Sequence, residues 1–369
     1  MRTLVVSDLH LGARGELDVL RVPANRERLV AALTGADRLV LLGDVIELRQ
    51  GPARDALAAA APTLRALGTG LATGARVTLV PGNHDHGLLA PWLNRRGRDA
   101  PPPPLGLQTA AEARDDEPLA RIVEWLGQGG AEVEVAYPGS WLRPDVYAMH
   151  GHYSDRHCTV PMLERLGAGA MARIAAPAPA GPRRAEDYEA VLGPMYAWMD
   201  ALAQADAAPR RSGTAGASAS AWRALAGAGG RRGPRRRAVA AAFPAIVAIL
   251  RALGLGPLSA DLSPDALRRA RLQAIGEVVS RLGVVAAHVI VGHTHRAGPL
   301  PGDDLGEWRV GTMLTNCGCW VRDPAFAGVE PGSSPYRPGF AAIVGEESPP
   351  ALVNLLDPPG PGRSTPRGS

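Results

Sequence analysis

Residues 1–12, MRTLVVSDLHLG, combine a short apolar run, Thr3–Val6, with a cluster of polar residues directly after it. The same pattern recurs at Arg38–Leu42 before GDVIE, at Arg76–Val80 before PGNHDH, at Val146–Met149 before HGH and at His288–Val291 before GHTHR. Short apolar runs bounded by glycine and proline predict buried strands. Helical patterns at 20–33 and 53–67 separate the first three runs, which predicts an α/β fold. Ligands in such folds bind at the carboxyl ends of strands, where these polar clusters lie.

The composition excludes several classes of chemistry. The chain has 369 residues, and all 40 of its basic residues are arginines, since lysine is absent. Schiff-base enzymes, Walker A phosphate loops and Ser-Lys dyads all need a lysine and are therefore excluded. Three cysteines, Cys158, Cys317 and Cys319, are too few for a disulfide framework, and the N-terminus lacks the apolar core of a signal peptide. We therefore expect a cytoplasmic protein.

The polar clusters contain the ligand types of a metal site. Seven of the nine histidines lie in them: His10, His84, His86, His150, His152, His293 and His295. Mixed imidazole, carboxylate and amide ligands suit Mn, Fe, Zn, Co or Ni. Two carboxylates, one amide and four imidazoles exceed the needs of one tetrahedral ion and fit two ions that share a carboxylate. In an extended segment residues i and i+2 point the same way, so Asp8 and His10, like His293 and His295, are expected to face one pocket.

The ordered series DLH, GDVIE, GNHD, HG and GHTH spans positions 8 to 295 and resembles the calcineurin-like metallophosphoesterase superfamily. The resemblance implies two stacked mixed β-sheets flanked by helices, a four-layer α/β sandwich that holds a dinuclear metal centre. Position by position, it implies Asp8, His10 and His295 at the first metal, Asn83, His150 and His293 at the second, and Asp44 as the bridge. It also implies that His84 assists the leaving group and that Asp85 orients His84.

This resemblance predicts a hydrolase of phosphomonoesters, phosphodiesters or pyrophosphate bonds that acts on a phosphorylated small molecule. Two divalent ions, manganese among the candidates, would activate a bridging water as hydroxide, while a protonated His84 donates to the departing oxygen. His86 and His152 are candidates to contact substrate. The motifs SDLHLG and GHTHR are also similar to those of UDP-2,3-diacylglucosamine pyrophosphatases, which usually carry Arg in place of His84 and Asp in place of His152. A nuclease of the same superfamily and a non-catalytic scaffold remain alternatives.

The middle of the chain differs in charge from the rest. Residues 156–271 contain 17 arginines against 8 acidic residues, a net of +9, and the remaining residues carry 23 arginines against 28 acidic residues, a net of −5. We expect this segment to be an insertion, a cap or lid, in a metallophosphoesterase domain formed by 1–155 and 272–357. Composition predicts a flexible part at 206–237 and a disordered tail at 358–369.

Two stretches near the end of this insertion carry further predictions. The run RRGPRRR precedes an apolar stretch, and 231–250 together could contact a membrane surface, nucleic acid or a phosphate-rich substrate, or form a solvated loop beside a packed helix. Few aromatic residues accompany the arginines, so base stacking is not expected. The pattern of Ser263–Leu282 predicts a helix with Ser263 as N-cap and Gly283 just beyond its end.

Overall fold

The computed structural model describes residues 1–96, 103–159, 181–205, 245, 247–252, 257–261, 263–322, 332 and 334–358. The segment 206–237, the arginine run within it, and all but the first residue of the tail 358–369 lie outside the described residues. None of the helices among the described residues is long and apolar enough to cross a membrane. The cytoplasmic location stays a prediction.

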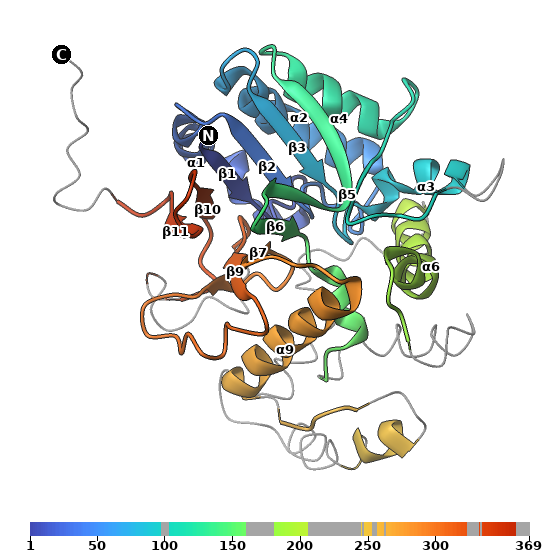
Figure 1. Cartoon of the computed structure of the whole chain (residues 1–369). Helices are drawn as coiled ribbons and strands as arrows, with labels where there is room; N and C mark the ends of the chain where they lie inside the picture. The colour runs from blue at the N-terminus through green and yellow to red at the C-terminus, as the bar shows by residue number, and fades with distance from the viewer. Residues whose placement is uncertain are drawn as a thin grey trace.

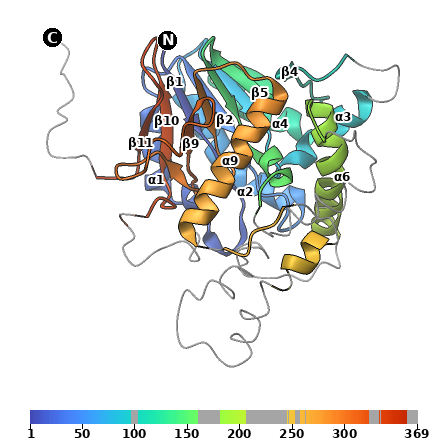
Figure 2. The same ribbon diagram turned by 60° about the horizontal axis from the view of Figure 1, so that its bottom comes forward.

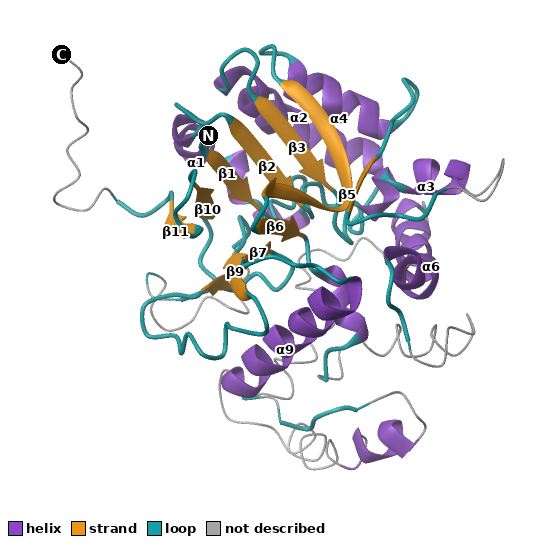
Figure 3. Ribbon diagram, in the orientation of Figure 1, coloured by secondary structure: helices purple, strands orange, loops and turns teal. Residues whose placement is uncertain are grey.

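The strands form one mixed sheet (Figures 1 and 3). They are β1 (Thr3–Val6), β2 (Arg38–Leu42), β3 (Arg76–Val80), β4 (Gln108–Ala110), β5 (Glu132–Arg143), β6 (Val146–Met149), β7 (His288–Val291), β8 (Ala297–Gly298), β9 (Met313–Cys317), β10 (Phe340–Val344) and β11 (Ala351–Asn354). Their order is β11-β10-β1-β2-β3-β5-β6-β7-β9-β8, with β4 paired to β5. Strands β1, β2, β3 and β5 run parallel, as do β6, β7 and β9.

The helices cover this sheet and extend from it (Figure 3). They are α1 (Pro23–Ala32), α2 (Ala53–Gly70), α3 (Ala90–Arg96), α4 (Pro118–Gly127), α6 (Ala185–Gln204) and α9 (Pro264–Leu282). Short 3-10 helices are η1 (Arg14–Glu16), η2 (Val19–Arg21), η3 (His86–Leu88) and η4 (His152–Arg156). In α4 the apolar residues repeat at helical spacing, and Leu119, Ile122 and Leu126 are buried in the core shared with α2 and the strands.

The five strands predicted from apolar runs are confirmed with the bounds given above. The helix at Pro264–Leu282 is confirmed as well: the Ser263 hydroxyl accepts from the Ala266 backbone amide, and Gly283 has a φ of 69°. The sequence analysis did not predict β4, β5, β8, β10, β11, α3, α4 or α6. Helix α9 passes without interruption through position 271, where the insertion was expected to end.

Strand β5 joins the two halves of the sheet. Its first part pairs with β3, as Val133 does with Val77, and its second part pairs with β6, as Ser140 does with Ala148. Buried residues from both halves share one apolar cluster: Val5, Val40, Leu42, Val80, Ala136, Leu142, Val146, Ala148, Ile290, Cys317, Ala342 and Val344. A mixed α/β fold is therefore confirmed. The two separate stacked sheets are not confirmed, because β5 belongs to both halves and joins them into one continuous sheet.

Helices α6 and α9 lie on either side of the loops that follow β3 and β6 (Figure 2). Helix α6 packs against η3 and η4, and α9 packs against η4. The described part of the expected insertion is thus in contact with the segments that carry the histidine clusters. Whether it acts as a lid stays a prediction.

Candidate metal centre

The polar clusters at the ends of β1, β2, β3, β6 and β7 converge in the structure. Three groups of side chains each bring their ligand atoms within 4.8 Å of one another. These groups are Asp8, His10 and His295; His10, Asp44 and His84; and Asp44, His150 and His293. Asp44 and His10 each belong to two groups, so the three groups form one continuous cluster. Such a set of buried carboxylates and imidazoles has the composition of a transition-metal site.

On one side of this cluster, Asp8, His10 and His295 face one another. His295 Nε2 lies 3.1 Å from His10 Nε2 and 3.3 Å from Asp8 Oδ1. Asp8 is fully buried, and its Oδ1 accepts no hydrogen bond from the described residues. A buried carboxylate oxygen without a donor is costly, whereas a cation at this position would satisfy it and separate the two imidazoles. The residues present therefore fit a metal ion.

On the other side, His150 lies between Asp44 and Asn83. His150 Nε2 is 3.3 Å from Asp44 Oδ2 and 3.2 Å from Asn83 Oδ1. All three side chains are buried, and His293 completes the group. The structure thus brings together all seven residues that the sequence predicted as metal ligands: Asp8, His10, Asp44, Asn83, His150, His293 and His295.

The backbone at these ligands is strained. Among the described residues, the non-glycine residues with positive φ are Asp8 (54°), His10 (44°), Asp44 (51°), His293 (65°) and His295 (60°). Left-handed conformations are uncommon outside glycine, cost of order 1–3 kcal/mol each, and concentrate at functional sites. The expected extended geometry at Asp8, His10, His293 and His295 is therefore wrong, since β1 ends at Val6 and β7 at Val291 before the chain enters left-handed turns.

Backbone hydrogen bonds hold two of these turns in place. The Asp8 amide donates to the Gly43 carbonyl at 3.0 Å, and the His10 amide donates to the Asp44 carbonyl at 2.8 Å. A further constraint comes from Gly82, where an added Cβ would lie 2.4 Å from Asp44 Oδ1. Glycine is therefore required at this position so that the loop after β3 can approach Asp44.

A second set of contacts orients the imidazole rings. His10 Nδ1 contacts Glu47 Oε2 at 3.1 Å, the Nδ1 of His150 contacts the Leu42 carbonyl at 2.9 Å, and His293 Nε2 contacts Asp155 Oδ1 at 2.9 Å. Such partners fix the tautomer of a metal ligand and leave the other ring nitrogen for the metal. Sequence reasoning missed Glu47 and Asp155 as site residues. The available signal was an acidic residue inside two of the motifs, GDVIE and HGHYSD.

The buried charges of the cluster stabilise one another. Burial alone would raise the pKa of Asp8 and Asp44, but His10 and His295 lower the first and His150 lowers the second, so both carboxyls are ionised. Burial lowers the pKa of His150 and His295, yet Asp44 raises the former to about 9 and Asp8 raises the latter to about 10. Without metal, the cluster therefore keeps protons on imidazoles that a metal would need deprotonated.

His84 lies at the edge of the cluster with its side chain 29% exposed. Its Nδ1 contacts Glu47 Oε2 at 2.9 Å, so Glu47 orients both His84 and the predicted metal ligand His10. Burial lowers the pKa of His84, although Glu47 opposes this shift. Because His84 also falls in a ligand group with His10 and Asp44, it has access to two roles, metal ligand and proton donor.

Asp85 does not orient His84 in the structure. Its carboxylate accepts from the backbone amides of Gly82 at 2.6 Å and Val45 at 2.7 Å, which ties the loop after β3 to the loop after β2. Burial, together with the charge of Asp44, raises the pKa of Asp85 to about 6. Asp85 therefore supports the backbone of the site, and the orienting role that the sequence assigned to it belongs to Glu47.

Of the two candidate substrate residues, His152 lies beside the cluster, whereas His86 contacts helix α6. His86 Nε2 contacts Glu189 Oε2 of α6 at 2.9 Å, while His152 Nε2 contacts the Tyr137 hydroxyl at 3.3 Å. The His152 ring centroid is 5.5 Å from that of His150. Burial and the neighbouring His150 hold the pKa of His152 well below its usual range, so this imidazole is neutral.

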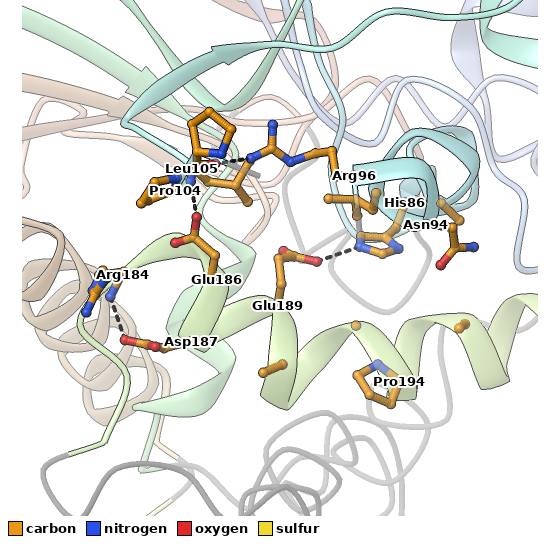
Figure 4. A pocket seen from close by; sticks show the side chains of 16 residues that line it. His86, Asn94, Arg96, Pro104, Leu105, Arg184, Glu186, Asp187, Glu189 and Pro194 are labelled. Carbon is orange, nitrogen blue, oxygen red and sulfur yellow. Dashed lines mark hydrogen bonds and ion pairs between the residues drawn. The ribbon is translucent and has the colours of Figure 1, made fainter. Parts of the chain in front are cut away.

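A cavity of about 670 Å³ opens between α3 and α6 (Figure 4). Its wall is mainly apolar, with Leu93, Pro104 and Pro194 among the lining residues, and His86 and Glu189 meet along one side of it. Clefts of this size that combine an apolar wall with a few polar groups commonly hold small molecules. His86 follows His84 by two residues and lines this cavity, but none of the seven predicted metal ligands does.

Comparison with known proteins agrees with this geometry. The family model described as calcineurin-like phosphoesterase matches residues 1–174, which carry five of the seven predicted ligands. A search of curated proteins found no match. The other two ligands, His293 and His295, follow the matched region in sequence but lie in the same cluster. Residues 1–174 of this chain therefore match the calcineurin-like phosphoesterase family, and the match supports the metallophosphoesterase superfamily that the sequence predicted.

Proposed function

We propose that the protein is a metal-dependent phosphoesterase that holds two divalent ions and hydrolyses a phosphomonoester, phosphodiester or pyrophosphate bond. The observation that carries this proposal is the cluster of ligand groups with Asp44 in two of them, built on left-handed backbone at five positions. A carboxylate shared by two adjacent ligand groups could serve two neighbouring ions. The family match to calcineurin-like phosphoesterases supports a phosphoester substrate.

We assign the ligands to two positions. Asp8, His10 and His295 would hold one ion, Asn83, His150 and His293 the other, and Asp44 both. Mn, Fe, Zn, Co and Ni all accept this mixture of oxygen and imidazole ligands. When bound, two such ions supply Lewis-acid stabilisation of phosphoryl charge and a water of lowered pKa.

The remaining residues have roles in positioning and proton transfer. Glu47 accepts from Nδ1 of His84, which leaves Nε2 to exchange a proton with the leaving-group oxygen. His84 is partly exposed, so substrate can reach it. The cavity between α3 and α6 offers space for the organic part of a phosphorylated small molecule.

A substrate screen of metal-reconstituted protein tests the proposal. The screen pairs chromogenic phosphomonoesters and phosphodiesters with nucleotides, sugar nucleotides and DNA, each with several divalent metals. Asp44→Ala should lose both metal and turnover, whereas His84→Ala should keep metal and lose turnover. If no metal supports hydrolysis of any substrate, or if Asp44→Ala is fully active, the proposal is wrong. Metal loss in His84→Ala would instead make His84 a ligand.

A further inference from the structure

Several buried polar atoms beside the metal centre lack a hydrogen-bond partner among the described residues. They include Arg49 Nη2, Tyr196 Oη, His152 Nδ1 and Asp155 Oδ2. Tyr196 and His152 are 1% and 2% exposed. Buried polar groups are nearly always paired, because an unpaired one loses its hydration without compensation. Four such atoms close together indicate a place where a polar ligand belongs.

Ring contacts connect these residues into one group next to the metal ligands. The Arg49 guanidinium carbon lies 5.1 Å from the Tyr196 ring centroid, and the Tyr196 ring is 5.7 Å from that of His152. His152 in turn lies 5.5 Å from the ligand His150, ring centroid to ring centroid. Arg49 lies in the loop between β2 and α2, and Tyr196 comes from α6, so two distant parts of the chain meet here.

Both donors of this group are protonated at any working pH. A guanidinium does not lose its proton in proteins, and burial holds the pKa of the Tyr196 hydroxyl well above its usual range. Arg49 is linked to His84 through Glu47: the Arg49 backbone amide donates to Glu47 Oε1 at 2.9 Å, and Glu47 Oε2 contacts His84 Nδ1 at 2.9 Å. A fixed cation and a hydroxyl donor therefore lie close to the residue that faces the leaving group.

The two acceptor atoms of the group have a different character. Asp155 Oδ1 lies 2.9 Å from His293 Nε2 and 3.6 Å from Arg271 Nη1, so its charge is already balanced. The Tyr137 hydroxyl donates to Glu189, so His152 Nε2 must donate to Tyr137, and His152 Nδ1 is left as an acceptor. The anion-binding atoms are therefore those of Arg49 and Tyr196.

We propose that Arg49 and Tyr196 form a phosphate-oxygen subsite, in which the guanidinium and the hydroxyl donate to oxygens of the substrate's phosphoryl group that do not face the metal ligands. This inference rests on the proposed function. A planar guanidinium binds phosphate oxygens in a bidentate manner, with more geometric specificity than a point charge. Tyr196 belongs to α6, which lies outside the residues matched by the family model. The subsite therefore includes α6 in the substrate site.

Binding of inorganic phosphate to the manganese-loaded protein, measured by titration calorimetry, tests the subsite. Arg49→Gln should weaken phosphate binding roughly 10- to 100-fold and Tyr196→Phe roughly 3- to 10-fold, as expected for one charged and one neutral hydrogen bond. The manganese content of both variants should match wild type. The matched arginine control is Arg65→Gln. Arg65 also covers an aromatic ring, that of Trp125, but it belongs to helix α2 and not to the loop that carries Arg49.

Thermal unfolding of the metal-free protein separates a ligand-binding role from a structural one. Tyr196→Phe should leave the melting temperature unchanged or higher, because the lost hydroxyl has no partner among the described residues. The control Tyr188→Phe, on the same helix, should lower the melting temperature, because the Tyr188 hydroxyl is 2.8 Å from His157 Nε2. Tyr188→Phe should also keep the phosphate affinity of wild type.

Two outcomes would overturn the subsite and can be told apart. If Arg49→Gln and Tyr196→Phe bind phosphate within about twofold of wild type while hydrolysis proceeds, the subsite is wrong and the proposed function stands. If the manganese-loaded wild type neither binds phosphate nor hydrolyses any phosphoester, both inferences fail together.

Discussion

Glu47 is the residue whose replacement tests the architecture of the site most sharply. Its carboxylate accepts from four donors. Oε2 accepts from the Nδ1 atoms of His10 and His84 at 3.1 and 2.9 Å and from Gln50 Nε2 at 3.3 Å, and Oε1 accepts from the Arg49 backbone amide at 2.9 Å. Burial would raise the pKa of Glu47, but His84 and His10 keep it below its usual value, so the carboxylate is charged. One buried group thus orients a metal ligand and the candidate proton donor.

Glu47→Gln keeps the shape of this side chain but cannot satisfy all four donors. An amide has one acceptor oxygen, so in either orientation its NH2 group faces an N–H donor of His10 and His84 or of Arg49. An unsatisfied buried donor costs about 1–3 kcal/mol. That cost corresponds to roughly a 5- to 150-fold loss of metal affinity, which overlaps the loss of about 10- to 100-fold known when a partner of a metal ligand is replaced.

The assay measures manganese affinity by competition with a chromogenic chelator and turnover on the best substrate of the screen. Glu47→Gln should lower both quantities, since His10 and His84 depend on the same carboxylate. The control is Glu134→Gln, which removes a carboxylate that contacts Arg38 at 2.9 Å on β5. Manganese affinity and turnover of Glu47→Gln equal to those of Glu134→Gln would refute the reasoning.

Three further predictions follow from the same contacts. Asp44 and Asp8 raise the pKa values of His150 and His295 to about 9 and 10, so below pH 9 metal binding should release protons and the metal affinity should rise with pH. Calorimetry in two buffers measures the proton release, and a metal affinity that does not depend on pH would contradict the prediction. Gly82→Ala should lose metal, measured by elemental analysis, because a Cβ would lie 2.4 Å from Asp44 Oδ1; full metal occupancy would show that the loop can move. Burial would raise the pKa of Glu189, but His86 and two tyrosine hydroxyls lower it, so the stability that Glu189 contributes is present above pH 4.5 and is lost as the pH falls through the lowered pKa. In urea unfolding, Glu189→Gln should therefore lose less stability on acidification than wild type. Equal losses in the two proteins would argue against this prediction.

Local patterns in the sequence predicted a large part of the fold. Strands β1, β2, β3, β6 and β7 have the predicted bounds. Each is a short apolar run, and such a run can be recognised in the sequence without knowing which strand it pairs with. Strand β5 escaped prediction because its twelve residues, with Pro138 among them, mix polar and apolar residues according to two different neighbours. The path of the sheet through β5 therefore could not be predicted.

The candidate site divides in the same way. The seven candidate metal ligands could be predicted because each follows a predicted strand inside a recognisable motif. Their left-handed conformations could not, because they depend on hydrogen bonds such as that from the His10 amide to the Asp44 carbonyl. The family resemblance assigned Asp85 as the partner of His84, whereas the fold places Glu47 there and turns Asp85 toward backbone amides.

The sequence by itself determined which residues could bind metal and the class of chemistry, since ligand types and strand ends are properties of short segments. Tertiary structure alone decided which groups surround those ligands. Arg49 and Tyr196 are separated by almost 150 positions, yet the guanidinium of one lies over the ring of the other. Their meeting depends on how α6 packs against η3 and η4, and contacts between such distant segments leave no periodic pattern in the chain.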